Sequence, residues 1–306
     1  MKQKVTGKLS FVGSLSRDPF FGYILITPIL IWMIAILVYP LFRAAHMSFL
    51  DIGFIGEQGS FIGFSGYTEL FRNPEFREGL LRSIIWTGAN VVVQVAIAFL
   101  AALILDMEFR GRSFVRIWVL LPWVVPVIVL ATMWRWMLEP SLGIVNYVLL
   151  ATGTIQSRIP FIGSTQFAMG TAIVVNSWRW FPFYAIIILA ALQTIPQDTF
   201  QAAKVDGANG LQQFRYITLP SIAPMLSTVV LLSSLWAANV FDMLLLLTRG
   251  GPRDATTTLP IMIYRAGFQR YQLSQAAVIA IVMFVLLLVY AVIYMKTLGA
   301  QEEYQQ

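Results

Sequence analysis

The chain has 306 residues, of which 58% are hydrophobic and only 12% are charged, whereas soluble domains average about 25% charged residues. Its mean hydropathy of +0.73 and its long uncharged blocks exclude an ordinary water-soluble domain. The net charge of +6 would suit nucleic acid, but the basic residues are dispersed, which favours anchoring at anionic lipid. With no cysteine and a single histidine, His46, the sequence excludes disulfides, thiolate metal sites and a His-pair metal site.

The N-terminal tail, residues 1–19, carries Lys2, Lys4, Lys8 and Arg17 ahead of an apolar run, as a secretory signal does. The uncharged run over residues 20–42 is longer than the ~7–15 residue core of a cleavable signal. We therefore predict a retained first membrane span.

Six apolar blocks meet or approach the roughly 20 residues that a helix needs to cross a bilayer. They predict an all-α polytopic membrane protein with a six-span domain over residues 20–298 and a tail at 299–306. The predicted spans are residues 20–42, 83–105, 117–138, 167–192, 222–247 and 276–295. Arg135, Arg179 and Asp242 interrupt the third, fourth and fifth spans.

The basic residues divide evenly between the two sides, but all lysines, the basic tail and the short turn 107–116 fall on one side. This pattern predicts that both termini are cytoplasmic. The predicted outer connections, residues 46–82, 139–166 and 248–275, are rich in turn-forming glycine and predict irregular surface connectors.

The predicted inner connection, residues 193–221, holds two helix-length stretches. Pro196 can begin the first helix, and Gly207 can end it in a left-handed conformation. A second helical turn over residues 211–216 is expected to end at Pro220. Two short helices around a glycine form a knob suited to a cleft in a soluble partner; an amphipathic interfacial segment is the alternative.

Small, apolar and turn-forming residues recur at fixed spacing around this connection. They are Ala202, Ala203, Asp206, Gly207, Ala208, Phe214, Ile217, Leu219, Pro220 and Pro224. The pattern resembles the signature cytoplasmic loop of binding-protein-dependent ABC importer permeases. Trp180-Phe181-Pro182 and Thr248-Arg249-Gly250-Gly251-Pro252 resemble the carbohydrate-uptake branch, of the maltose and glycerol-3-phosphate type.

The resemblance implies the type I importer permease fold in a bacterial or archaeal inner membrane. It implies ATPase docking by Gln201, Ala202, Ala203, Asp206, Gly207, Ala208 and Phe214. Gln201 stands where the family has glutamate, so a family salt bridge at this position would lose its charge. The implied partners are a second homologous permease, giving a heterodimer, two ATP-binding subunits and an extracytoplasmic solute-binding protein.

The sequence contains no Gly-x-x-x-x-Gly-Lys-Ser/Thr phosphate loop. We therefore expect ATP and magnesium on the partner subunits, and no cofactor, catalytic residue or metal site in this chain.

Polar and aromatic residues within the fourth and fifth predicted spans are the candidates for a solute pathway. Asn176, Trp180 and Phe183 share one helical face, where an amide suits sugar hydroxyls and aromatic rings suit sugar C–H groups. Ser233, Trp236, Asn239 and Asp242 repeat this chemistry. The resemblance implies solute contacts from Asn176, Arg179, Trp180, Phe183, Ser233, Trp236 and Ala237. Alternatively, Arg179 and Asp242 form a structural pair or snorkel to an interface.

Asn90 and Gln94, four residues apart on the second span, are predicted to make helix-to-helix hydrogen bonds. For the whole chain we predict import of a sugar or polyol, and Arg179 would also suit glycerol 3-phosphate or an acidic sugar. An ion-driven transporter or channel needs membrane carboxylates, of which only Asp242 qualifies. A membrane-embedded enzyme needs paired acids, a Ser/His pair or a metal cluster, which these spans lack.

Overall fold

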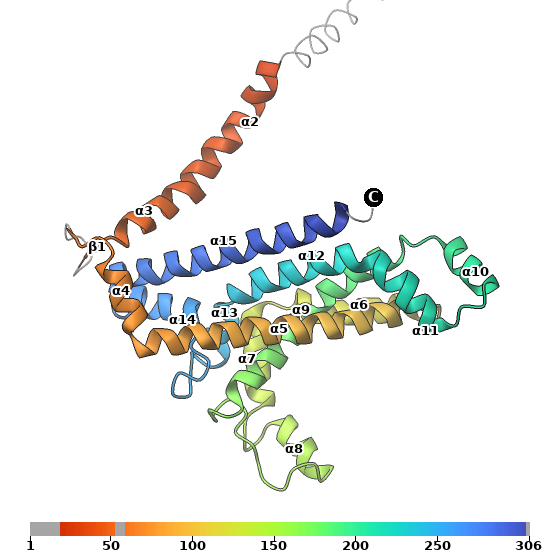
Figure 1. Ribbon diagram of the computed structural model, residues 1–306. Helices are drawn as coiled ribbons and strands as arrows, with labels where there is room; N and C mark the ends of the chain where they lie inside the picture. The colour runs from red at the N-terminus through yellow and green to blue at the C-terminus, as the bar shows by residue number, and fades with distance from the viewer. Residues whose placement is uncertain (1–18, 53–58, 304–306) are drawn as a thin grey trace, which may run out of the picture.

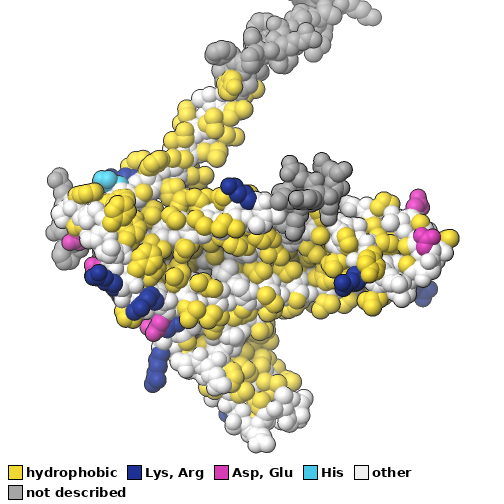
Figure 2. Space-filling model, in the orientation of Figure 1, with side chains coloured by type: hydrophobic (Ala, Val, Ile, Leu, Met, Phe, Trp, Pro, Cys, Tyr) yellow, Lys and Arg dark blue, Asp and Glu magenta, His cyan; other side chains and the backbone are white. Residues whose placement is uncertain are grey.

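The computed structural model describes residues 19–52 and 59–303, which are mostly helical (Figure 1). The basic tail with Lys2, Lys4, Lys8 and Arg17 and the last three residues lie outside the described part. Within the described residues, five helices are long and apolar enough to cross a membrane, and a strongly bent helix pair makes a sixth span if its two helices are counted together. Apolar side chains cover the visible face of the body, while charged side chains lie mostly toward its two ends (Figure 2).

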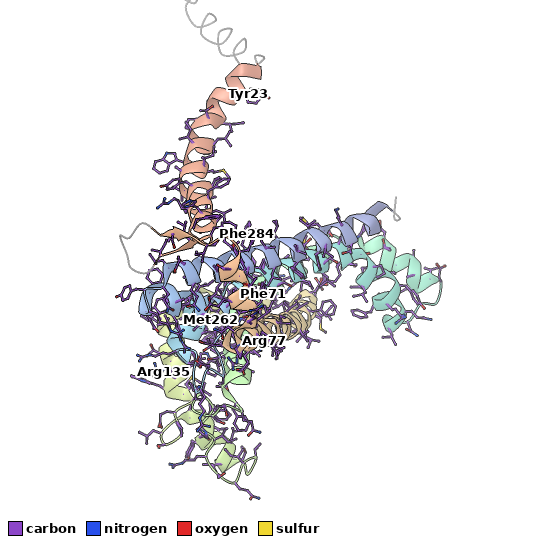
Figure 3. The ribbon with its side chains drawn as sticks, turned by 60° about the vertical axis from the view of Figure 1, so that its left-hand side comes forward. Tyr23, Phe71, Arg77, Arg135, Met262 and Phe284 are labelled. Atoms are coloured by element: carbon purple, nitrogen blue, oxygen red, sulfur yellow. The ribbon has the colours of Figure 1, made fainter. Side chains whose placement is uncertain are left out.

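The first span projects away from the body as α2 (Pro19–Met33), a π-helical turn η1 (Ile34–Val38) and α3 (Tyr39–Met47). Figure 3 shows Tyr23 at the far end of this projection, whereas Met262 and Phe284 lie in the body. None of the apolar window in this span is buried, so within this chain it makes no contribution to the core.

A short hairpin and a helix follow the first span, so the prediction of an irregular connector over residues 46–82 is wrong. Strands β1 (Leu50–Asp51) and β2 (Ser60–Phe61) pair antiparallel, and α4 (Ser65–Arg72) comes next. The long helix α5 (Pro74–Asp106) then begins well before residue 83. Asn73 caps it by accepting the Glu75 amide at 2.8 Å, and proline suits the first helical position.

The third predicted span is not one helix. It consists of α6 (Arg112–Val124) and α7 (Val127–Met137), which are bent by 95° relative to each other. Val125 and Pro126 between them have extended ψ angles of 130° and 136°, because a residue before proline avoids the helical region and proline lacks an amide donor. The following connection, residues 139–166, includes α8 (Ile144–Ala151) and is therefore not wholly irregular.

The fourth span is the continuous helix α9 (Ala168–Leu192), which packs along α5. Small residues at the contact, among them Ala98, Ala102 and Ala185, are fully buried. Small side chains let helix backbones approach closely, which is how helices associate in a medium as apolar as their side chains.

The fifth predicted span, residues 222–247, is also interrupted. Helix α12 (Leu219–Ala238) ends before residues 239–241, and α13 (Asp242–Leu247) follows. Trp86 of α5 donates its indole N–H to the carbonyl of Ala237 at 2.9 Å, and the same carbonyl accepts from the Val240 amide at 3.1 Å. Asn239 and Asp242 therefore do not continue the helical face of Ser233 and Trp236.

The chain ends with α14 (Leu259–Tyr264), the π-helical turn η3 (Arg265–Gln269) and the long helix α15 (Leu273–Glu303). Helix α14 lies within the segment predicted as an irregular connector, residues 248–275, and α15 continues into the segment predicted as a tail. Figure 1 shows α5, α12 and α15 running side by side, with α10 at the opposite end of the body from α14.

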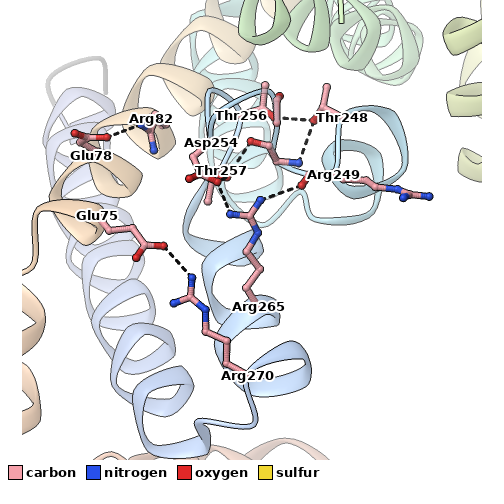
Figure 4. Close-up of polar contacts among 12 residues, drawn as sticks. Glu75, Glu78, Arg82, Thr248, Arg249, Asp254, Thr256, Thr257, Arg265 and Arg270 are labelled. Atoms are coloured by element: carbon pink, nitrogen blue, oxygen red, sulfur yellow. Dashed lines mark hydrogen bonds and ion pairs between the residues drawn. The ribbon is translucent and has the colours of Figure 1, made fainter. Parts of the chain in front are cut away.

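The loop between α13 and α14 is held by a polar network (Figure 4). Arg249, Arg253 and Asp254 have positive φ angles, a conformation that costs about 1–3 kcal/mol for a non-glycine residue. Arg265 holds the loop by an ion pair with Asp254 and a 3.1 Å hydrogen bond to the Arg249 carbonyl. The hydrogen bond from Arg265 lowers the pKa of Asp254 from its ordinary value, against the opposing effect of partial burial.

We predict that Asp254→Asn increases trypsin cleavage after Arg249, because loss of the ion pair frees the strained loop. The lowered pKa means that the pair stabilises the loop above the ordinary carboxyl pKa of about 3.9 and loses this effect as the pH falls through the lowered value. Near neutral pH, the ion pair between Asp254 and Arg265 should therefore stay intact. Glu78→Gln, which removes an ion pair to Arg82 within α5, is the control; equal cleavage of both variants would contradict the prediction.

Candidate functional site

The predicted docking loop contains helix α10 (Gln197–Val205), which begins immediately after Pro196. At its end, the amide of Ala208 donates to the Ala203 carbonyl at 2.9 Å. Gly207 has φ of +83°, so its predicted left-handed stop is confirmed.

The second helix of the loop, α11 (Gly210–Gln213), is capped reciprocally by Asn209 and Gln212, at 2.9 Å and 2.7 Å. It continues through the π-helical turn η2 (Phe214–Thr218) into α12. The prediction that Pro220 ends this helix is wrong. Pro220 lies in the first turn of α12, where its missing amide costs little, and the π turn bonds Leu219 back to Phe214.

The loop forms a projecting knob at the right-hand end of the body (Figure 1). Its tip exposes apolar side chains, with Val205 88% and Leu211 76% exposed. Of the predicted docking residues, Gln201, Ala202, Asp206 and Gly207 are exposed, while Ala203, Ala208 and Phe214 are partly buried. The base of the knob is anchored, because Phe200 packs on the core and the Phe214 ring lies 6.0 Å from Phe99 of α5.

A buried polar network joins α5, α9 and α12, and every side chain in it is at most 1% exposed. Asn90 accepts hydrogen bonds from Asn176 at 2.8 Å and Gln94 at 3.0 Å, and Ser233 donates to Gln94 at 2.8 Å. The packing role predicted for Asn90 and Gln94 is confirmed. Asn176 and Ser233, expected in the solute pathway, also contribute to this helix contact.

An aromatic cluster lies beside this network. Trp180 and Phe183 of α9 have ring centroids 5.1 Å and 5.3 Å from that of Trp236 on α12. Trp123 of α6 joins the cluster at 5.3 Å from Phe183, and Tyr184 stacks on Trp180. Sequence patterns missed Trp123, because it lies on a different span. Tyr184 was also missed, although it follows Trp180 by four residues and so lies on the predicted face of α9.

Two polar atoms at this place are buried without a hydrogen-bond partner: Asn176 Oδ1 and Trp180 Nε1. They lie one turn apart on α9 and present one acceptor and one donor. Since the large majority of buried polar side-chain atoms in proteins have a partner, this pair is suited to a ligand that offers a hydroxyl group, which both donates and accepts.

Arg179 and Asp242 lie together, with Nη1 and Oδ2 3.6 Å apart. The Arg179 side chain is 17% exposed and that of Asp242 48%. The guanidinium carbon also lies 5.3 Å from the Trp180 ring centre, within cation–π range. Asn239 is exposed and bonds back to the Leu235 carbonyl, so it joins neither the polar network, the aromatic cluster nor the Arg179–Asp242 pair.

Comparison with known proteins identifies the family. Residues 94–298 match the family described as "binding-protein-dependent transport system inner membrane component". The trehalose/maltose transport system permease protein MalF of Thermococcus litoralis is 31% identical over 300 residues, covering 97% of this chain and 98% of the relative. The chain belongs to this family: it is a multi-pass inner-membrane permease subunit of a binding-protein-dependent ABC importer.

Other relatives agree in fold and family. The sulfoquinovosyl glycerol transport system permease protein SmoG of Agrobacterium fabrum is 29% identical, covering 93% of this chain and 92% of the relative. A crystal structure of a bacterial ABC transporter that imports the acidic polysaccharide alginate matches with a TM-score of 0.82 and 25% identity, over 95% of this chain and 99% of that one. A second structure of an alginate ABC transporter contains an alginate pentasaccharide-bound periplasmic protein and matches over 92% of this chain and 94% of that one, with a TM-score of 0.80.

These matches confirm the predicted all-α importer-permease fold and the predicted family. They also set aside the alternatives of an ion-driven transporter and a membrane-embedded enzyme, because the chain is a subunit of an ABC importer.

Proposed function

We propose that this chain and a second homologous permease form the pathway for a sugar or related polyol, delivered by an extracytoplasmic solute-binding protein. The observation that carries the solute class is the buried acceptor and donor, Asn176 Oδ1 and Trp180 Nε1, beside the aromatic cluster. The names of the relatives support it, since they refer to trehalose or maltose, sulfoquinovosyl glycerol and alginate.

In this proposal a solute hydroxyl donates to Asn176 and accepts from Trp180. The ring of Trp236, which is 38% exposed, supports the apolar C–H face of the sugar, because binding sites for small molecules combine apolar walls with a few polar anchors. Phe183 holds Trp236, and the network through Ser233 holds Asn176. The pathway thus contains a buried polar pair, Asn176 and Trp180, and an aromatic platform, Trp236, that is more accessible than the pair.

Arg179 determines which charge the solute can carry. Its 3.6 Å distance to Asp242 is longer than a close hydrogen-bonded ion pair. A carboxylate or phosphate on the solute can therefore replace Asp242 as the partner of Arg179. This makes an acidic sugar or glycerol 3-phosphate the alternative solute to a neutral sugar.

The knob is the proposed docking site for one ATP-binding subunit. The second permease would dock a second, separate ATP-binding subunit in the same way. Its exposed Ala202, Asp206 and Gly207, together with the apolar tip, form a small convex surface on a cytoplasmic loop. The sequence has no phosphate-binding loop, so ATP and magnesium belong to the partners in this proposal. Both termini of the chain are then cytoplasmic, on the same side as the knob.

We predict that Gly207→Val abolishes co-purification of the ATP-binding subunits, whereas Gly210→Val does not. A Cβ at either position meets no atom within 4 Å, but only Gly207 has a positive φ. A left-handed backbone costs an L-residue about 1–2 kcal/mol, and more if it is β-branched, so valine should displace the end of α10. Co-purification with undiminished transport in Gly207→Val would refute the docking role.

We predict that Asn176→Ala combined with Trp236→Ala lowers uptake of the transported solute about 10- to 100-fold, because one hydrogen bond and one aromatic contact are lost. Uptake of maltose, trehalose and glycerol 3-phosphate would be measured in proteoliposomes holding the complete importer. Trp136→Ala is the control, since Trp136 is 77% exposed and lies outside the cluster. An unchanged rate and solute preference would argue against the pathway assignment.

A further inference from the structure

Helix α6 connects the two functional regions of the chain. Its first residues lie beside the start of the docking loop, and its last turn carries Trp123, which contacts Phe183 in the aromatic cluster at 5.3 Å. Thirteen residues of α-helix span about 18 Å at ~1.5 Å per residue. One helix therefore reaches from the knob to the proposed solute site.

The cytoplasmic end of α6 is bonded to the first residue of the loop. Gln193 is the C-cap of α9, and with its amide oxygen facing α6 it accepts from Arg112 Nη2 at 3.0 Å and from Arg116 Nη2 at 3.1 Å. Arg112 also donates from Nε to the Leu105 carbonyl at 2.6 Å and lies 3.8 Å from Asp106. The ends of α5 and α9 thus both contact the Arg112 side chain at the start of α6.

This contact has a feature that packing alone does not require. Within the described residues, Arg116 has no carboxylate partner, and its Nε is buried without a hydrogen bond. Two guanidinium groups therefore share one neutral acceptor, and of the two only Arg112 has a carboxylate near it, that of Asp106. A weak, shared contact can change partners when the loop moves.

The path from the knob to Gln193 is short and packed. Helix α10 begins at Gln197, and Ile195 between them is only 9% exposed. Along α6, Val115 and Val119 pack on the core cluster formed by α5 and α9. The break at Pro126 lets α6 shift without carrying α7 with it.

We propose that Gln193, Arg112 and Arg116 are positioning residues that transmit displacement of the docking loop through α6 to Trp123 and the aromatic cluster. This inference rests on the proposed docking of an ATP-binding subunit at the knob. Without this contact, the knob still holds its partner and ATP is still hydrolysed. However, less of the displacement of the docking loop then reaches the aromatic cluster at the solute site than in the wild-type chain.

The test uses the complete importer in proteoliposomes and measures solute transported per ATP hydrolysed. Gln193→Met keeps the side-chain length but removes the acceptor. We expect the ATP-binding subunits to co-purify and ATP hydrolysis to stay within about twofold of wild type, while solute per ATP falls about tenfold, as for single substitutions along a coupling network. Gln193→Glu, whose carboxylate accepts from both guanidinium groups, should restore the ratio.

The matched control is Arg110→Ala against Arg112→Ala. Arg110 is an exposed residue of the same turn and makes no ion pair with any residue that the structure describes, so only Arg112→Ala should lower the ratio. If solute transported per ATP is unchanged in Gln193→Met, or does not recover in Gln193→Glu, this inference is overturned while the proposed function stands. A wild-type chain that retains no ATP-binding subunit would overturn the proposed function together with it.

Discussion

The hydrocarbon of the bilayer cannot hydrogen-bond to a peptide group, and the rest of the structure depends on this constraint. Every span must satisfy its own backbone, which explains the long continuous helices α5, α9 and α15. Where α12 ends, the Ala237 carbonyl accepts from the Val240 amide at 3.1 Å and also from the Trp86 indole at 2.9 Å. The break between α12 and α13 also places Asp242 beside Arg179. The interrupted helix therefore contributes directly to the proposed pathway.

The docking loop follows different rules because water can reach it. Its helices are short and end on a left-handed glycine and a reciprocal cap, devices that satisfy helix ends locally. Exposed apolar residues at its tip, such as Val205 and Leu211, are unfavourable in water, and the proposed ATP-binding subunit would cover them. The chain thus combines a lipid-embedded body with one projection suited to a soluble protein.

Five apolar helices and one bent helix pair overlap the six spans predicted from hydropathy, since each span needs a long uncharged run, and motif spacing was sufficient to predict the family. The breaks could not be predicted, because proline alone is ambiguous in a membrane helix. Pro182 and Pro224 lie inside intact helices, whereas Pro126 separates α6 from α7. The difference depends on whether neighbouring helices can satisfy the freed carbonyls. Trp123 could not be assigned to the aromatic cluster from the sequence either, because its position depends on how α6 packs against α9.

The central claim is that the knob faces the cytoplasm and contacts an ATP-binding subunit. Because the chain contains no cysteine, single cysteines can be introduced at Leu211 on the knob and at Phe61 on the hairpin at the other end, which are both 76% exposed. A membrane-impermeant maleimide should label Leu211→Cys only in inverted vesicles and Phe61→Cys only in right-side-out vesicles, and Leu211→Cys alone should cross-link to the ATP-binding subunit. Labelling of Leu211→Cys from the extracytoplasmic side would contradict the account.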